Sequence, residues 1–113
     1  MIITKIFNFE SAHKLENYDG NCANLHGHSY VLHVSIQGKT NSEGFVLDFK
    51  DIKSIVNESI IFKLDHSFLN KVIERPTAEN IVLWIWSQLK DRLKLYELRL
   101  YETATSYVVY NGD

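Results

Sequence analysis

The segment Asn21–Tyr30, NCANLHGHSY, places a thiol and two imidazoles within seven positions. Cys22 is the only cysteine of the chain, and His26 and His28 are two of its five histidines. Two interpretations are open. Either these side chains are ordinary polar residues where a strand begins, or they hold a metal ion beside a nucleophile or base.

The spacing of His26 and His28 favours a common direction for their side chains, because side chains alternate between the two faces of a strand. His13 ends an earlier alternating segment, on the side of its apolar residues, and pairing of the two segments brings a third imidazole to the same place. Three histidines around zinc leave a fourth position for substrate or water. Gly27 lets the backbone approach a metal. Paired histidines are also common on polar surfaces, and His33 needs no special role.

Cys22 also has two interpretations. A free cysteine is usually a small buried hydrophobic residue. Here its neighbours Asn21, Ala23 and Asn24 predict a loop, not a core strand. A thiol near a dication or a protonated histidine has a lowered pKa, which suits a base or nucleophile.

Two acidic positions extend the pattern. Leu98, Leu100 and Glu102 share one face of a predicted strand, and a carboxylate is costly to bury without a partner. The alternative is that the strand end is open to water there. Asp65 and His66 follow an apolar segment; Asp65 could cap a turn, and His66 could be a general acid or base.

Composition indicates one cytoplasmic, soluble domain over residues 1–113. The formal net charge is −2 and the sequence pI about 6.2, so no nucleic-acid partner is expected. A single cysteine cannot form an internal disulfide, which fits a reducing compartment. No segment approaches the roughly 20 apolar residues of a membrane span, so no membrane partner is expected either.

Alternating apolar residues predict the strands. They indicate strands over residues 2–13 and 28–38, a hairpin partner at 45–49, and a closing hairpin that turns at Ala104 and Thr105. Helical spacing predicts one helix that opens at Asp48 or Phe49 and a second over residues 74–95, with Thr77 as its N-cap. The expected class is α+β, an antiparallel sheet with two helices on one face.

The second predicted helix also carries extra apolar surface. Leu83, Trp84 and Trp86 lie beside its core stripe, and exposed patches of this kind often mark subunit contacts.

The sequence resembles the 6-pyruvoyltetrahydropterin synthase superfamily, most closely its bacterial 6-carboxytetrahydropterin synthase branch. The resemblance runs nearly end to end and rests on FNFESAHKL, CANLHGHSY, GFVLDFKDIK, LDHSFLN, PTAEN and YETATSYVVY. In the pyruvoyl enzymes the cysteine lies further from H-G-H, and aldolase-like relatives have a glutamate in place of Cys22. One departure is Gly20–Asn21, where the family often has Lys or Arg.

The resemblance implies a tunnelling fold, assembled as an oligomeric barrel from two stacked trimers, with sites between subunits. It implies zinc bound by His13, His26 and His28, and a catalytic Cys22 that works with Asp65 and His66. It also implies that Glu102 anchors the pterin ring, with Thr103 nearby. Thr77 and Glu79 match the family's P-T-x-E motif, although capping of a helix and a first-turn acid explain them equally well.

The implied reaction is the zinc-dependent conversion of 7,8-dihydroneopterin triphosphate to 6-carboxy-5,6,7,8-tetrahydropterin, acetaldehyde and triphosphate, in the pathway to queuosine and other deazapurines. Lys14, Lys50, Lys53 and Arg75 are candidates to meet the phosphates or are plain surface charges. A pyruvoyl-type synthase or related pterin side-chain lyase is one alternative. A zinc- or pterin-binding protein without turnover is another.

Overall fold

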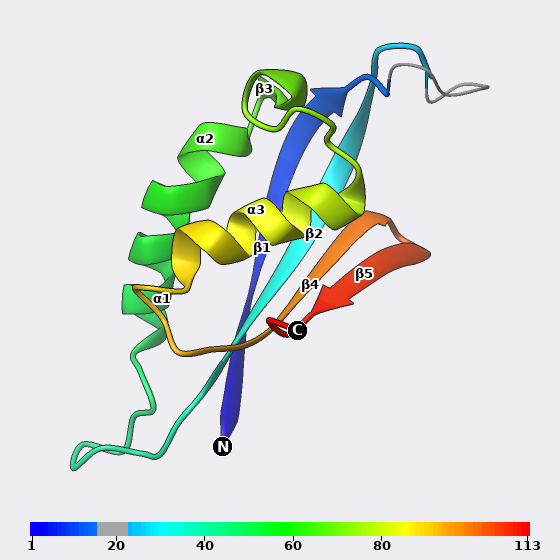
Figure 1. Cartoon of the computed structure of the whole chain (residues 1–113). Coiled ribbons are helices and arrows are strands. Elements are labelled where there is room, and N and C mark those ends of the chain that lie inside the picture. Colours follow the sequence, from blue (N-terminus) through cyan, green and yellow to red (C-terminus); the bar gives the residue numbers. More distant parts are fainter. Residues whose placement is uncertain (16–22) are drawn as a thin grey trace.

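A mixed sheet of five strands carries the helices of this chain, as Figure 1 shows. The computed structural model describes residues 1–15 and 23–113. The strands are β1 (Ile2–His13), β2 (His26–Gln37), β3 (Ser67–Phe68), β4 (Leu95–Thr103) and β5 (Ser106–Tyr110). The helices are α1 (Phe49–Val56), the π-helical turn η2 (Asn57–Ile61), α2 (Phe62–Leu64), the 3-10 turn η3 (Leu69–Lys71) and α3 (Ala78–Leu89).

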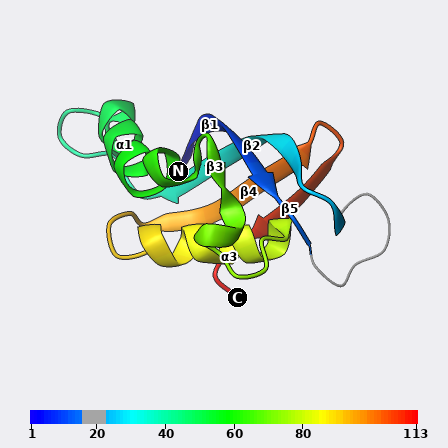
Figure 2. The same ribbon diagram turned by 90° about the horizontal axis from the view of Figure 1, so that it is seen from above.

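The strand order in the sheet is β3-β1-β2-β4-β5. The four long strands are antiparallel neighbours, as predicted, and β3 adds two residues in parallel at the edge beside β1. Figure 2 shows β1, β2, β4 and β5 in sequence across the sheet, with α3 running along one side of them. The closing hairpin of β4 and β5 is also confirmed.

One face of the sheet forms the core together with the helices. Alternate residues of β1 and β2 are buried, and they pack against the buried stripe that α1, η2 and α2 share and against the buried side of α3. The main contributors are Phe7, Phe9, Tyr30, Leu32, Val34, Ile52, Val56, Ile60, Leu64, Ile81, Ile85, Leu89, Leu98 and Leu100. The predicted α+β class with the helices on one face is therefore confirmed.

The helix starts follow from local hydrogen bonds. Asp48 is the N-cap of α1 and accepts from the backbone N–H of Lys50, and Thr77 is the N-cap of α3 and accepts from that of Asn80. Both starts match the prediction, but α3 ends at Leu89 instead of continuing to residue 95, where β4 begins. Trp84 and Trp86 of α3 are half-buried against the core, so only Leu83 of the apolar surplus predicted on this helix is exposed.

The predicted strand at 45–49 is wrong, because polar side chains bend the backbone there into turns. The Asn41 carboxamide oxygen accepts from the N–H groups of Glu43 and Phe45, and Asp48 caps α1. Val46 and Leu47 nevertheless pack against the core from this loop. No helix among the described residues is long and apolar enough to cross a membrane.

Candidate metal centre and active site

The ends of β1 and β2 bring three imidazoles together. His13 is directly opposite His26 in the antiparallel register, and His28 lies two residues further along β2 on the same face. One ring nitrogen from each of His13, His26 and His28 lies within 4.8 Å of the other two. The convergence predicted from parity is therefore present, on the face of the sheet that also carries the core.

Backbone carbonyls fix the direction of two of these rings. The Nδ1 of His13 is 2.8 Å from the carbonyl oxygen of Pro76, and the Nδ1 of His26 is 2.7 Å from that of Asn24. A carbonyl can only accept, so both Nδ1 atoms donate, and in the neutral rings each Nε2 carries a lone pair. These two Nε2 atoms are 2.9 Å apart. Two facing lone pairs repel each other, and a cation held between them removes the repulsion.

The third ring has a free nitrogen as well. The Nε2 of His28 is buried and has no hydrogen-bond partner, and it lies 3.7 Å from Oε1 of Glu102. Burial lowers the pKa of His28, and the neighbouring His13 and His26 add to this effect while the Glu102 carboxylate opposes it. A neutral imidazole with an unshared lone pair is the form that binds a metal. The donor set of this site thus fits a metal ion.

Tyr30 completes the inner wall of the metal centre. It is fully buried, stacks on Phe9 with ring centroids 5.0 Å apart, and has its hydroxyl 3.4 Å from Nδ1 of His13. Burial and the charge of Glu102 both raise the pKa of the phenol, which keeps it protonated. Tyr30 therefore supports His13 as a neutral, rigid neighbour.

Gly27 does not serve the purpose predicted for it. A Cβ at this position would lie 3.5 Å from the carbonyl oxygen of Ser11, an ordinary contact, and its φ is not positive. The residue belongs to the face of β2 opposite to His26 and His28. Close approach of this backbone to a metal is not what requires glycine here.

Asp65 and His66 form a pair of their own beside β1. The Nδ1 of His66 is 3.0 Å from Oδ2 of Asp65, and Oδ1 of Asp65 accepts from the N–H of Glu10 at 2.9 Å. The hydrogen bond from Glu10 lowers the pKa of Asp65, desolvation opposes this, and His66 adds to the lowering. His66 has a positive φ of 56° and a side chain that is 79% exposed. Its ring is thus available to an outside partner.

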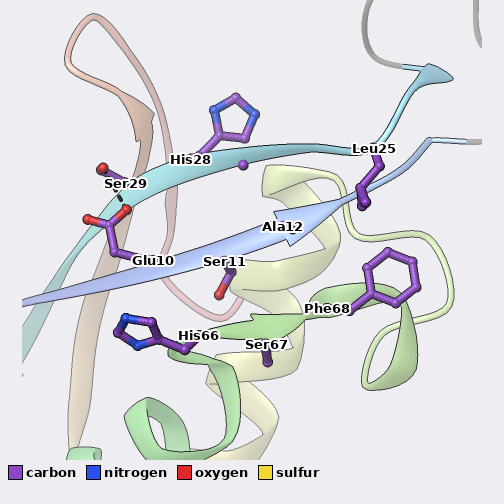
Figure 3. Close-up of a pocket in the computed structure, with 10 residues that line it drawn as sticks. Glu10, Ser11, Ala12, Leu25, His28, Ser29, His66, Ser67 and Phe68 are labelled. Atoms are coloured by element: carbon purple, nitrogen blue, oxygen red, sulfur yellow. Dashed lines mark hydrogen bonds between the residues drawn. The ribbon is translucent and has the colours of Figure 1, made fainter.

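This pair lies beside the edge of β1, and of the three histidines His28 lines the same pocket as His66. His66 lines a pocket of about 650 Å³ whose other walls include Glu10, Leu25, Ser29 and Phe68. Figure 3 shows Ser29 and Glu10 facing each other across the two strands, joined by a hydrogen bond, with His66 and Phe68 on the β3 side. Among the described residues, neither hydrogen bonds nor ring contacts join His66 to the metal centre.

Glu102 lies at the metal centre and also lines a second pocket, of about 390 Å³. Thr77 and Glu79, at the start of α3, line the same pocket, so the predicted substrate-binding residues Glu102, Thr77 and Glu79 come together. Thr103 does not join them. It lines a different pocket with His33 and Tyr101, and its hydroxyl accepts from the N–H of Thr105 within the β4–β5 turn.

Cys22, the predicted catalytic thiol, lies outside the described residues.

Of the predicted phosphate-binding cations, Lys14 follows His13 directly and Arg75 precedes Pro76, whose carbonyl oxygen binds His13. Lys50 and Lys53 belong to α1, which lies toward the beginning of β1, whereas the histidines are at its end (Figure 1). The fold therefore does not bring these two lysines to the metal centre.

Comparison with known proteins identifies the architecture. The family described as 6-pyruvoyl tetrahydropterin synthase matches residues 2–113. The chain belongs to this family. It is 38% identical over 136 residues to the 6-carboxy-5,6,7,8-tetrahydropterin synthase of Haemophilus influenzae, covering 96% of each chain. It is 37% identical over 131 residues to the 6-pyruvoyl tetrahydrobiopterin synthase of Dictyostelium discoideum, covering 100% of this chain and 97% of the relative.

A solved structure of the family agrees with the fold. The 6-pyruvoyl tetrahydropterin synthase of Caenorhabditis elegans superposes with a TM-score of 0.89 at 26% identity, covering 100% of this chain and 96% of that one. The predicted family, its resemblance to the carboxy branch and the expectation of an enzyme are confirmed by these relatives, which are named as tetrahydropterin synthases.

The structure adds site residues that the sequence did not single out. Ser11 and Tyr30 lie on the same face of β1 and β2 as the histidines, because each is two residues from a histidine. This alternation is visible in the sequence and could have identified them. The carbonyl groups of Asn24 and Pro76 carried no signal, because any residue type offers a carbonyl.

Proposed function

We propose that this chain is a zinc-dependent lyase that converts 7,8-dihydroneopterin triphosphate and one water molecule to 6-carboxy-5,6,7,8-tetrahydropterin, acetaldehyde and triphosphate, and serves the biosynthesis of queuosine or other deazapurines. The observation that carries the proposal is the set of three imidazoles with unshared Nε2 lone pairs beside Glu102. A relative named for this product, 38% identical over nearly its whole length, supports it.

In this proposal His13, His26 and His28 hold the zinc ion. When bound, zinc acts as a Lewis acid toward the side-chain hydroxyls of the substrate and makes the adjacent carbon–hydrogen bonds more acidic. The two carbonyl groups that fix His13 and His26 keep their ε-nitrogens as the ligating atoms.

Proton transfer falls to the other predicted catalytic residues. Cys22, as the thiolate, removes a proton from the substrate side chain, and His66 with Asp65 returns protons elsewhere. The lowered pKa of Asp65 keeps it ionised, so it can orient the His66 ring and stabilise its protonated form.

Glu102 anchors the pterin ring by accepting hydrogen bonds from its amino and ring N–H groups, which supplies the partner that a half-buried carboxylate needs. Thr77 and Glu79, in the same pocket, are proposed as supporting contacts. Lys14 and Arg75 are the proposed phosphate contacts, and Thr103 remains a weaker candidate because its pocket is separate.

A homohexamer built from two trimers, located in the cytoplasm, is proposed as the working form. The support is that, among the described residues of one chain, neither a hydrogen bond nor a ring contact joins Asp65–His66 to the three histidines. A neighbouring copy can supply the pair that one chain does not bring to its own metal centre.

A pyruvoyl-type synthase is the second candidate, because the Dictyostelium relative named for that product is 37% identical over the whole chain. It shares the proposed zinc site and Glu102 but releases no acetaldehyde. A protein that binds zinc and pterin without turnover is the third.

The deciding experiment incubates zinc-loaded protein with 7,8-dihydroneopterin triphosphate and measures acetaldehyde and the pterin product. Acetaldehyde with 6-carboxytetrahydropterin supports the lyase, and a pyruvoyl product without acetaldehyde supports the second candidate. The Cys22→Ala variant is the control. It should retain zinc and pterin binding and lose turnover, whereas binding without any Cys22-dependent turnover supports the third candidate.

A further inference from the structure

The Asp65–His66 pair is bound to β1 and, through the N–H of Asp65 and the carbonyl of Ile61, to the preceding helix. Glu10 donates its N–H to Asp65 and accepts from the N–H of His66 at 2.6 Å. Both contacts use the backbone of Glu10, so they form whichever residue occupies the position. They fix the position of the pair along β1. They do not hold the end of the preceding helix, which other contacts must hold.

That helix end is Leu64, the last residue of α2. The chain turns from helical to extended at Asp65, with φ −68° and ψ 132°. Carbonyl groups in the last turn of a helix have no partner within the helix. The carbonyl of Leu64 is buried and accepts from two hydroxyl groups, those of Ser11 and Ser67.

The two hydroxyl groups differ in what they connect. Ser67 lies three residues after Leu64, so its hydrogen bond of 2.7 Å is local to the turn. Ser11 comes from β1, is only 6% exposed, and lies 53 residues away in the sequence. It is also directly opposite His28 in the register of β1 and β2. Ser11 alone of the two ties the residue before the pair to the strand that carries the metal ligands.

We propose that Ser11 is a positioning residue for the Asp65–His66 pair: its buried hydroxyl holds the carbonyl of Leu64 against β1 and thereby sets where the His66 ring stands. Ser11 lines the same pocket as His66, but its hydroxyl is bound to the carbonyl of Leu64, so in this proposal it acts through the pair. The assignment rests on the proposed function only in so far as the pair transfers protons in that reaction.

The test compares Ser11→Ala with Ser67→Ala in zinc-loaded protein. Both variants remove one hydroxyl from the same carbonyl and leave the other, so both should fold, as checked by their melting temperatures. Ser11→Ala should lower kcat about tenfold with zinc content and KM unchanged, because misplacement by 1 Å can cost up to roughly 100-fold. Ser67→Ala should stay within about twofold of wild type. Equal losses in the two variants would overturn the proposal.

A double variant separates positioning from a general loss of stability. If Ser11 acts through His66, then Ser11→Ala/His66→Ala should be no slower than His66→Ala alone, since the positioned group is already gone. Losses that multiply in the double variant would contradict the assignment.

A third measurement does not depend on the reaction. Amide hydrogen exchange at Glu10 and His66, whose N–H groups form the contacts between β1 and the pair, should be faster in Ser11→Ala than in wild type and unchanged in Ser67→Ala. If wild-type protein fails to turn over the pterin, the proposed function falls while this measurement still decides the positioning role. Unchanged exchange in Ser11→Ala would refute it.

Discussion

Among single residues, the three imidazoles of the metal centre differ in how they are held. His13 and His26 each donate to a backbone carbonyl, whereas the Nε2 of His28 is buried without a hydrogen bond, with Oε1 of Glu102 3.7 Å away. Two rings are thus fixed before a metal binds, and the third completes the set. Ligands oriented in this way lose little freedom on binding.

Removal of one ring tests the ligand set. His26→Ala takes away one of the two facing Nε2 atoms, so zinc affinity should fall by more than the roughly 10–100-fold that results from losing a group hydrogen-bonded to a ligand. Zinc content after dialysis against a weak chelator measures the effect. His33→Ala is the matched control, because His33 lies on the other face of β2, against Tyr101, and should keep full zinc. Full occupancy in His26→Ala would rule out the three-histidine assignment.

His66 carries backbone strain, since a positive φ of 56° is unfavourable for any residue with a Cβ. Its side chain is largely exposed, so its removal costs little packing. His66→Gly should therefore be more stable than His66→Ala by about 1 kcal/mol, measured by urea unfolding. Both variants should be equally inactive. Equal stability would show that the left-handed conformation costs nothing here.

Among elements, the start of α3 links helix capping to the metal centre. Thr77 caps the helix, and the residue before it, Pro76, supplies the carbonyl that orients His13. Thr77→Ala should lower the free energy of unfolding by about 1 kcal/mol and weaken zinc binding, while Thr77→Ser should keep both. If Thr77→Ser keeps its stability and zinc but has a raised KM for the pterin, the Thr77 methyl group contacts the substrate.

The helices and strands also differ in how well the sequence predicts them. Periodicity predicted β1, β2, α1, α3 and the closing hairpin, because each has a buried face that repeats every two residues or at helical spacing. The segment 45–49 was misread as a strand because its apolar residues pack from a loop. Asn41 and Asp48 determine that loop through side-chain hydrogen bonds, which periodicity does not report.

The candidate site was predictable to the same degree. Parity within β1 and β2 was enough to bring His13, His26 and His28 together. It could not show toward which face Asp65 and His66 open, because that depends on the parallel contact of β3 with β1 and on a left-handed residue in a turn. Both arise from contacts between segments more than fifty residues apart, as in the Asp65 bond to Glu10.

For the whole molecule, the sheet has two incomplete edges. β3 covers only Ser11 and Ala12, so most of β1 has no partner on that side, and β5 has none on its outer side among the described strands. Apolar side chains beside both edges are exposed, Ile6 by 54% and Val109 by 47%. Edges of this kind invite pairing with another chain unless something covers them.

Edge pairing between copies gives the last prediction. Wild-type protein should show a mass by light scattering that is a multiple of the 13.2 kDa chain, six times it for the proposed hexamer. Ile6→Lys places a charge beside the open edge of β1 and should lower that mass, because lysine at an edge opposes strand pairing. Leu83→Lys is the matched control, since Leu83 is 46% exposed but belongs to helix α3 and not to an edge strand. If the edges join the copies, Ile6→Lys should also lose turnover, whereas dissociation by Leu83→Lys alone would place the contact on the helix layer instead.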